Sequence, residues 1–309
     1  MTAPLQRLRE TVGTVYRGNA EAIDLVLIAI LSRGHVLIED VPGVGKTTLA
    51  RAIGKALDLK FTRIQFTSDT LPADVLGVSI FNAGENRFVF HPGPIFGNVV
   101  LADEINRATP KTQSALLQAM NEGRVSTDEG TLDLPQPFVV IATQNPVEYL
   151  GTYPLPESQL DRFFLRLSLG YPPAREEKDL LQRGGAERTL EAVAPVLLSG
   201  DLVALQNEVE HVRINDKLLD YVYALIDATR MRTDLRLPVS TRGAQAFYRA
   251  LQARALVAGR EFALPEDAQA VAEPVLSHRI LSISSDGFGT GPREREIIRA
   301  ILAEVPVPV

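Results

Sequence analysis

Asp40-Val41-Pro42-Gly43-Val44-Gly45-Lys46-Thr47-Thr48 is the stretch that decides the fold of this chain. An apolar run at 35–39 precedes it and a helical pattern at 47–57 follows it, so the order is strand, glycine-rich loop, helix. Gly43 and Gly45 allow the backbone to curl with several N–H groups pointing inward, and the start of the helix adds the positive end of its dipole. We therefore predict a phosphate-binding loop, for which an incidental glycine-rich turn is the alternative.

Two side chains of this loop indicate Mg-ATP as its ligand. Lys46 would place its ammonium beside the β- and γ-phosphates, and the hydroxyl of Thr47 would complete a Mg²⁺ coordination shell. The strict motif also has a glycine five residues before Gly45, where this chain has Asp40, so the match is incomplete although both later glycines remain. ATP and Mg²⁺ are the predicted cofactors. The predicted nucleotide-binding residues of the loop are Pro42, Gly43, Val44, Gly45, Lys46, Thr47 and Thr48.

Further apolar runs predict a parallel sheet. Four of them are typical of strands buried on both faces, at 61–66, 98–102, 138–143 and 163–169. A helix between two of these runs is well marked, because Thr109 can cap it, Pro110 suits its first turn and Gly123 can end it. The predicted fold class is α/β, with a parallel sheet flanked by helices.

The pattern changes after Tyr171-Pro172-Pro173. Helical apolar spacing then dominates, with no convincing strand between the helical segments, at 175–183, 215–231, 242–258 and 265–277. We predict two domains, an α/β nucleotide-binding core over residues 1–180 and a smaller all-helical domain over residues 190–309.

Polar side chains follow two of the predicted strands. Asp103 and Glu104 come at the end of the run at 98–102, and Asn145 comes after the run at 138–143. Asp103 would hold Mg²⁺, Glu104 would polarise the attacking water, and Asn145 would sit between that water and the γ-phosphate. Taken alone, the two acids could equally cap a helix and Asn145 could be a turn residue before proline. The phosphate-binding loop favours the catalytic interpretation.

The composition limits the function classes. The 309 residues carry 32 basic and 38 acidic side chains, and the net charge of -6 provides no general attraction to a phosphate backbone. The absence of cysteine excludes disulfides, thiolate metal sites and cysteine nucleophiles, and the four scattered histidines do not suggest a metal site. No secretory signal and no apolar run of membrane-spanning length are apparent. We expect a cytoplasmic protein without a membrane segment and without a nucleic-acid partner.

Four motifs together resemble the MoxR branch of the AAA+ ATPases, a branch with an insert in helix 2. They are the phosphate-binding loop, Asp103-Glu104-Ile105-Asn106-Arg107-Ala108, Asn145 and Leu160-Asp161-Arg162-Phe163, and the match runs through roughly residues 10 to 280. The resemblance implies an AAA+ core with a helical lid domain, hydrolysis of Mg-ATP, and assembly into a ring, expected to be a homo-hexamer.

The resemblance also implies roles for two arginines. In the family, the arginine of the Asp-Arg-Phe segment reaches the nucleotide of the neighbouring subunit, so Arg162 is similar to an arginine finger. Pairing of Arg162 with Asp161 or Glu157 of its own subunit is the alternative. Arg242, which opens a helix after Ser240 and Thr241, resembles the second sensor that contacts the γ-phosphate, although the family more often has proline where Thr241 stands. The predicted catalytic residues are Lys46, Glu104, Asn145, Arg162 and Arg242, and the predicted metal ligands are Thr47 and Asp103.

Two residues are weaker candidates that rest on the same resemblance. Arg107, just after the two acids, is a candidate for the subunit boundary. Tyr16 lies in Val15-Tyr16-Arg17-Gly18, a stretch that resembles the segment packing on adenine in the family. A simple turn between helices explains that stretch almost as well.

Two strand-turn-strand patterns fit the same branch. The pattern at about 78–92 resembles the helix-2 insert, and the pattern at about 124–135 resembles the pre-sensor hairpin. In related rings these hairpins face the central channel, so both are candidates for moving a client. Exposed decoration without a role is the alternative.

The resemblance favours a chaperone-like function. A MoxR-type ring would use ATP to remodel, assemble or activate a protein client, often with a partner protein that has a von Willebrand factor A domain. A motor subunit of a metal-chelatase complex is the first alternative, and a nucleic-acid-dependent ATPase is the second. The acidic balance and the lack of an appended basic domain argue against the second alternative.

Overall fold

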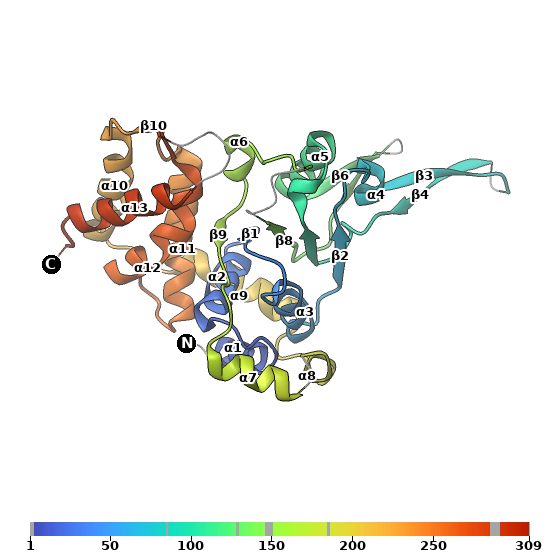
Figure 1. The fold of residues 1–309 in the computed structure, drawn as a ribbon, viewed down its shortest axis with the longest axis horizontal. Helices are drawn as coiled ribbons and strands as arrows, with labels where there is room; N and C mark the ends of the chain where they lie inside the picture. The colour runs from blue at the N-terminus through green and yellow to red at the C-terminus, as the bar shows by residue number, and fades with distance from the viewer. Residues whose placement is uncertain are drawn as a thin grey trace.

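The computed structural model describes residues 3–84, 86–127, 130–145, 151–183, 186–284 and 291–308. At its centre lies a five-stranded sheet with the order β2-β5-β8-β1-β9, in which every pairing is parallel (Figure 1). Its strands are β1 (Val36–Glu39), β2 (Phe61–Gln65), β5 (Val99–Asp103), β8 (Val139–Gln144) and β9 (Leu165–Leu167). The predicted parallel sheet is confirmed.

Both faces of the sheet are buried along β1, β5, β8 and β9, which explains why these strands lack polar alternation. The expectation was wrong for β2, an edge strand that leaves Arg63 and Gln65 exposed. On β5, Val99 and Leu101 belong to one core cluster, whereas Val100 and Ala102 belong to the other. The helices on the first side are α1 (Ala3–Val15), α2 (Ala20–Leu31) and α3 (Lys46–Ala56), and those on the second are α4 (Pro72–Leu76) and α5 (Pro110–Glu122). The sheet is therefore the middle layer of three.

Helix α5 has the start and stop signals that the sequence indicated. The Thr109 side chain accepts from the Thr112 amide at 3.5 Å, and Pro110 is the first helical residue. Gly123 follows the helix with φ of 65°, a conformation that costs glycine little because it has no Cβ. Asn19 caps α2 in the same way, accepting a hydrogen bond from the Glu21 amide at 2.9 Å.

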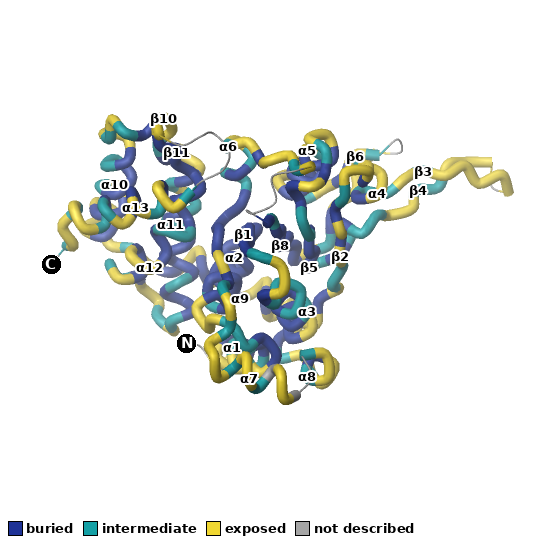
Figure 2. Tube along the Cα trace, viewed as in Figure 1, coloured by how far each residue is buried: buried dark blue, intermediate teal, exposed yellow. Residues whose placement is uncertain are grey.

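Two antiparallel hairpins leave the central layers. Strand β3 (Gly77–Asn82) pairs with β4 (Arg87–Pro92), and β6 (Arg124–Thr127) pairs with β7 (Gly130–Asp133). The β3–β4 hairpin projects far beyond the rest of the molecule, and its outer part is exposed (Figure 2). Hairpins therefore occupy both positions at which the sequence showed strand-turn-strand patterns.

Apolar side chains cover the projecting β3–β4 hairpin. Val78, Ile80, Phe81 and Phe88 are each about half exposed, and the rings of Phe81 and Phe88 meet edge to face with centroids 5.4 Å apart. Val78 and Ile80 lie on one face of the hairpin and Phe81 with Phe88 on the other. Large exposed apolar side chains gathered on one projecting element often mark a contact with another molecule. The hairpin is therefore a candidate contact surface.

The chain after β9 is mainly helical, as predicted. One element was not anticipated there, a short antiparallel ribbon of β10 (Leu235–Leu237) and β11 (Leu281–Ser282). Across the described residues, no helix is both long enough and apolar enough to cross a membrane. The other helices and turns are η1 (Ile105–Arg107), α6 (Glu157–Leu160), α7 (Ala174–Arg183), α8 (Glu187–Glu191), α9 (Ser199–His211), α10 (Asp216–Met231), α11 (Thr241–Val257), α12 (Pro265–Leu276), η2 (Ser277–Arg279) and α13 (Pro292–Glu304).

Apolar packing continues across the predicted domain boundary. The core cluster on the first side of the sheet also contains Phe247 of α11 and Val271 of α12, whereas the second cluster lies between the sheet and α5. The faces of the sheet, rather than the chain order, therefore divide the hydrophobic core. The division into residues 1–180 and 190–309 stays a prediction.

His35 fastens the start of β1 to two neighbouring elements. Its Nδ1 accepts from the Val140 amide at 3.0 Å, so the other ring nitrogen, Nε2, carries the hydrogen and donates to the Met120 carbonyl at 3.0 Å. The pKa of His35 is lowered to about 4. Burial is the main cause and the positive charge of Arg242 adds to it, while the hydrogen bond to the Met120 carbonyl acts in the opposite direction. Protonation would point an N–H at the Val140 amide, so only the neutral ring fits.

We predict that His35 makes the protein less stable as the pH falls from about 6.5 to about 4. In this pH window the unfolded chain binds a proton at His35 and the folded chain does not. The stability that the neutral ring contributes is therefore complete above the ordinary pKa of 6.5 and is lost as the pH falls toward about 4. A shift of this size corresponds to about 3 kcal/mol. Urea unfolding of His35→Gln across the window should show a shallower loss of stability, whereas His211→Gln, at an exposed helix end, should behave as wild type. If the free energy of unfolding falls equally with pH in all three proteins, His35 is not the cause of the loss.

Candidate functional site

The loop between β1 and α3 has the shape of a phosphate cradle. Gly43 and Gly45 have φ of 88° and 92°, values that let the backbone turn back toward the start of α3 at Lys46. No described backbone carbonyl accepts from the amides of residues 43–48. These amides and the positive end of the helix dipole are therefore available to an anion bound at the start of α3.

Lys46 lies at the entrance of this cradle. Its ammonium donates to the carbonyl oxygen of Asp40 at 2.7 Å. Burial lowers its pKa, while the negative charges of Asp103, Asp40 and Glu104 act in the opposite direction. A half-buried ammonium with three carboxylates nearby is well placed to exchange a carbonyl for phosphate oxygens.

Asp40 fixes the loop to the neighbouring strand. Its Oδ2 accepts three hydrogen bonds, from Ser168 Oγ at 2.9 Å, the Leu169 amide at 2.8 Å and the Gly170 amide at 2.7 Å. Its Oδ1 accepts from the Val41 amide at 2.8 Å. The residue that departs from the strict motif thus joins the start of the loop to the segment leaving β9.

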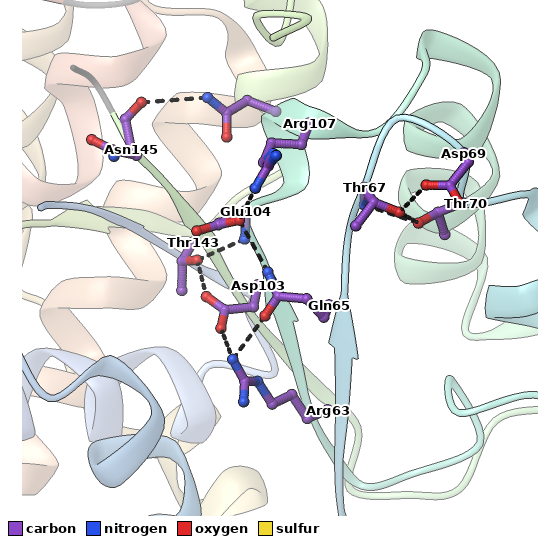
Figure 3. A network of polar contacts seen from close by, with 11 residues as sticks. Arg63, Gln65, Thr67, Asp69, Thr70, Asp103, Glu104, Arg107, Thr143 and Asn145 are labelled. Carbon is purple, nitrogen blue, oxygen red and sulfur yellow. Dashed lines mark hydrogen bonds and ion pairs between the residues drawn. The ribbon is translucent and has the colours of Figure 1, made fainter. Parts of the chain in front are cut away.

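Asp103 and Glu104 lie at the carboxyl end of β5, the same edge of the sheet as the loop. Thr143 on β8 bridges them, donating to Asp103 Oδ1 at 2.6 Å and accepting from the Glu104 amide at 2.9 Å (Figure 3). Glu104 has φ of 58°, a left-handed conformation that costs a non-glycine residue on the order of 1–2 kcal/mol. The Thr143 hydroxyl helps to hold this strained backbone.

Residues of β2 and η1 hold both carboxylates in place. Arg63 donates to Asp103 Oδ2 at 2.7 Å, and Gln65 donates to Glu104 Oε2 at 3.0 Å (Figure 3). Arg107 also reaches Glu104 Oε2, at 3.1 Å. Arg107 thus contacts an acid of its own subunit in this structure, and its place at a subunit boundary stays a prediction. Glu104 Oε2 thus accepts two hydrogen bonds from its own chain, and both donors have to move before this oxygen can accept a proton from water.

The donor set at this edge fits Mg²⁺ and a nucleotide phosphate. Asp103 and Thr47 offer a carboxylate and a hydroxyl, the hard oxygen ligands that Mg²⁺ accepts, and the empty space beside Gly43 allows phosphate to approach the backbone. Bound Mg²⁺ neutralises negative charge on the phosphate oxygens. Lys46 and the loop amides would orient the phosphates, and Glu104, once released by Gln65 and Arg107, would accept a proton from water.

Asn145 follows β8 at the same edge of the sheet. It is buried, and its backbone carbonyl accepts from Asn106 Nδ2 at 3.4 Å (Figure 3). The residues directly after it, 146–150, lie outside the described part of the chain. The structure thus brings together four predicted elements, the loop with Lys46, Asp103, Glu104 and Asn145.

Arg162 and Arg242 lie elsewhere. Arg162 precedes β9, and the Phe164 amide donates to the His35 carbonyl, just before β1, at 2.7 Å. Arg242 donates to Asn121 Oδ1 at 2.6 Å, at the end of α5. Both side chains therefore belong to the amino edge of the parallel sheet, opposite the loop. Contact of Arg242 with a γ-phosphate bound to its own subunit does not fit this position.

Tyr16 packs beside the cradle. It is buried, and a Cβ built on Gly45 would lie 3.4 Å from Tyr16 Cε2. Burial raises the pKa of Tyr16 to about 12, with the Asp40 carboxylate adding to the effect. The phenol therefore stays neutral next to the loop, and its stacking on adenine stays a prediction.

Fold and site together define a P-loop ATPase of the AAA type. The model of the ATPase family associated with various cellular activities matches residues 35–165, and the AAA lid domain model matches residues 227–301. A crystal structure of a protein from Cytophaga hutchinsonii superposes with a TM-score of 0.89 at 37% identity, covering 99% of this chain and 95% of that one.

Curated relatives narrow the class to one family. The uncharacterized protein YeaC of Bacillus subtilis is 48% identical, over 97% of this chain and 93% of its own length. Chaperone MoxR1 of Mycobacterium tuberculosis is 37% identical, over 98% and 82%, and protein MoxR of Paracoccus denitrificans is 32% identical, over 95% and 93%. The chain belongs to the MoxR family of AAA+ ATPases, and it is an ATP hydrolase.

Several residues of the site were missed by the sequence analysis. Arg63 and Gln65 alternate along β2 and so point to one side of it, but nothing in the sequence placed β2 beside β5. Thr143 stood only as the end of a strand. Asp40 was noted as a departure from the motif, and its buried acceptor role depends on β9, which is distant in the chain.

We predict that Glu104→Gln binds ATP but hydrolyses it about 10²- to 10⁴-fold more slowly, because the water loses its proton acceptor while the cradle survives. Fluorescent-nucleotide titration and phosphate release measure the two properties separately. Glu122→Gln, at the exposed end of α5, is the matched control and should hydrolyse normally. Normal turnover by Glu104→Gln would assign the base to another group.

Proposed function

We propose that this chain forms a ring, expected to be a homo-hexamer, that hydrolyses Mg-ATP at its subunit boundaries and uses the energy to remodel a protein client. One observation carries the proposal. The cradle and its acids lie at one edge of the sheet, and the two arginines needed to neutralise the transition state lie at the other. One copy of the chain therefore lacks a complete site, and a second copy can supply the missing arginines.

The surroundings of Arg162 support a role across the boundary. The two carboxylates that could have held it within its own subunit are occupied, since Asp161 pairs with Arg279 at 2.9 Å and Glu157 pairs with Arg236 at 3.5 Å. Arg162 instead lines a cavity of about 760 Å³ between α2, α5 and the helices α10 and α11. The described charged residues lining this cavity are five arginines and one acid, namely Arg33, Arg162, Arg242, Arg249, Arg279 and Asp161.

Charge complementarity points the same way. The cavity at the amino edge is rich in arginine, although Arg33 and Arg249 share Glu210 and Arg279 pairs with Asp161. The opposite edge carries Asp103 and Glu104 and would carry a polyphosphate. Head-to-tail contact between copies places unlike charges together, and a heterologous contact of this kind closes into a ring when its rotation allows. Arg162 and Arg242 would then contact the developing charge on the γ-phosphate.

The exposed β3–β4 hairpin supports a protein client. Its half-exposed Ile80, Phe81 and Phe88 suit apolar segments of another chain better than they suit a polyanion. The relative from Mycobacterium tuberculosis is named a chaperone, which agrees with this direction. A partner with a von Willebrand factor A domain and a cytoplasmic location complete the proposal, and a metal-chelatase motor is the second candidate.

We predict that Arg162→Ala loses hydrolysis when alone and regains part of it when mixed with Lys46→Ala. The first variant keeps an intact cradle and lacks the arginine, while the second keeps the arginine and lacks a working cradle. A mixed ring joins an intact cradle to an intact arginine. Arg236→Ala, an exposed arginine paired with Glu157, is the control and should stay active alone. No recovery at any mixing ratio would place the action of Arg162 within its own subunit.

The client class has its own test. Hydrolysis should be stimulated by an unfolded protein or by a von Willebrand factor A protein encoded nearby, and not by single-stranded or duplex DNA. Phe81→Ser together with Phe88→Ser should remove the stimulation and leave the unstimulated rate unchanged, because the hairpin lies far from the cradle (Figure 1). Strong stimulation by DNA alone would overturn the client assignment.

A further inference from the structure

A buried arginine of the lid, Arg279, donates hydrogen bonds to the segment that carries Arg162. Arg279 is 5% exposed and belongs to η2, the turn that follows α12. Its Nε donates to Asp161 Oδ1 at 2.9 Å, its Nη2 to the Phe163 carbonyl at 2.6 Å, and its Nη1 to the Phe164 carbonyl at 2.9 Å. The three acceptors flank Arg162 on both sides.

The same guanidinium is anchored to its own helix. Nη1 also donates to the Val275 carbonyl of α12. Burial lowers the pKa of Arg279 to about 10, while Asp161 opposes the effect, so the group is charged at neutral pH. The charged, planar guanidinium has acceptors on the segment 161–164 and on α12. It therefore fixes the position of these two elements relative to each other, because each hydrogen bond constrains a direction as well as a distance.

The start of helix α11 packs against Arg279 as well. A Cβ built on Gly243 would lie 2.9 Å from Arg279 Cδ, so only glycine fits there without a shift. Ser240, the N-cap of α11, donates to Asp161 Oδ2 at 3.3 Å. Arg242 is the second residue of this helix and lies close enough to lower the pKa of Arg279.

We propose that Arg279 is the positioning residue for Arg162 and Arg242, so that the angle of the lid sets whether the two arginines reach the neighbouring nucleotide. Arg279 bonds the Phe163 and Phe164 carbonyls at the amino edge of the sheet, opposite the cradle of its own subunit, so it acts through the residues that it holds. It donates hydrogen bonds to Asp161, Phe163 and Phe164, and it packs against the start of α11. Arg162, between these contacts, lines the cavity. This inference rests on the proposed action of Arg162 across the subunit boundary.

The test compares Arg279→Lys with Arg260→Lys. Lysine keeps the charge but cannot present a planar fork, so the first change disturbs geometry rather than electrostatics. Arg260 is the matched control, since it makes a bidentate pair with Asp267 of the lid, at 2.9 and 2.7 Å, away from Arg162. Arg279→Lys should bind fluorescent ATP with unchanged affinity and lose on the order of 10²-fold in kcat, as misplacement by about 1 Å would cause. Arg260→Lys should keep its kcat.

Mixing experiments separate positioning from a general loss of structure. Arg279→Lys mixed with Lys46→Ala should recover activity, because its cradle is intact and the neighbour supplies a well-placed arginine. Arg279→Lys added to the double variant Arg162→Ala/Arg242→Ala should slow hydrolysis no further, since both arginines that Arg279 positions are already absent. Recovery for Arg162→Ala but not for Arg279→Lys would overturn this inference and leave the ring intact. If neither variant recovers activity when mixed with Lys46→Ala, the ring proposal itself is wrong.

A second variant covers the case in which Arg279→Lys does not fold. Asp161→Asn keeps the shape of the side chain, removes its charge and turns one of its two acceptor oxygens into an NH₂ donor, so the side chain can no longer accept from both Arg279 and Ser240. It should show the same pattern of retained ATP affinity, lowered kcat and recovery with Lys46→Ala. Unchanged kcat in Asp161→Asn would overturn the inference.

Discussion

The parallel sheet, buried on both faces, is the constraint on which the rest of this structure depends. Helices cover each face, so the ends of the strands are the places where polar chemistry can reach solvent. Because all five strands run the same way, the two edges differ in kind. The carboxyl edge has free amides, Lys46 and two acids, and the amino edge has Arg162 and Arg242. The proposed division of the catalytic site between copies rests on this polarity.

At the carboxyl edge, the acids are already occupied by groups of their own chain. Arg63 neutralises Asp103, and Gln65 with Arg107 holds Glu104. These bonds stabilise carboxylates that would otherwise repel one another, and two of them occupy Oε2 of Glu104. If Glu104 Oε2 accepts the proton of the attacking water, as proposed, Gln65 and Arg107 have to release it first.

Much of the fold and of the loop could be predicted from sequence because the signals are local. Gly43, Gly45 and Lys46 between a strand and a helix, or Thr109, Pro110 and Gly123 around α5, act through neighbours in the chain. The helices α1, α9 and α13 were not predicted, since their short apolar stripes gain stability only from packing on distant elements. Arg279 was not found for the same reason: its partners lie more than a hundred residues away.

At position 40 the strict motif has glycine, whereas this chain has an aspartate that accepts four hydrogen bonds. Scored against the strict pattern, it is a mismatch, and a protein engineer matching a consensus would restore glycine there. That change would remove an acceptor of four hydrogen bonds, each worth about 1.5–3 kcal/mol when the acceptor is charged. It would also detach the loop from residues 168–170, where the chain leaves the sheet toward the lid. The consensus glycine would thus disconnect the phosphate-binding loop from the segment through which the chain passes from the sheet to its helical part.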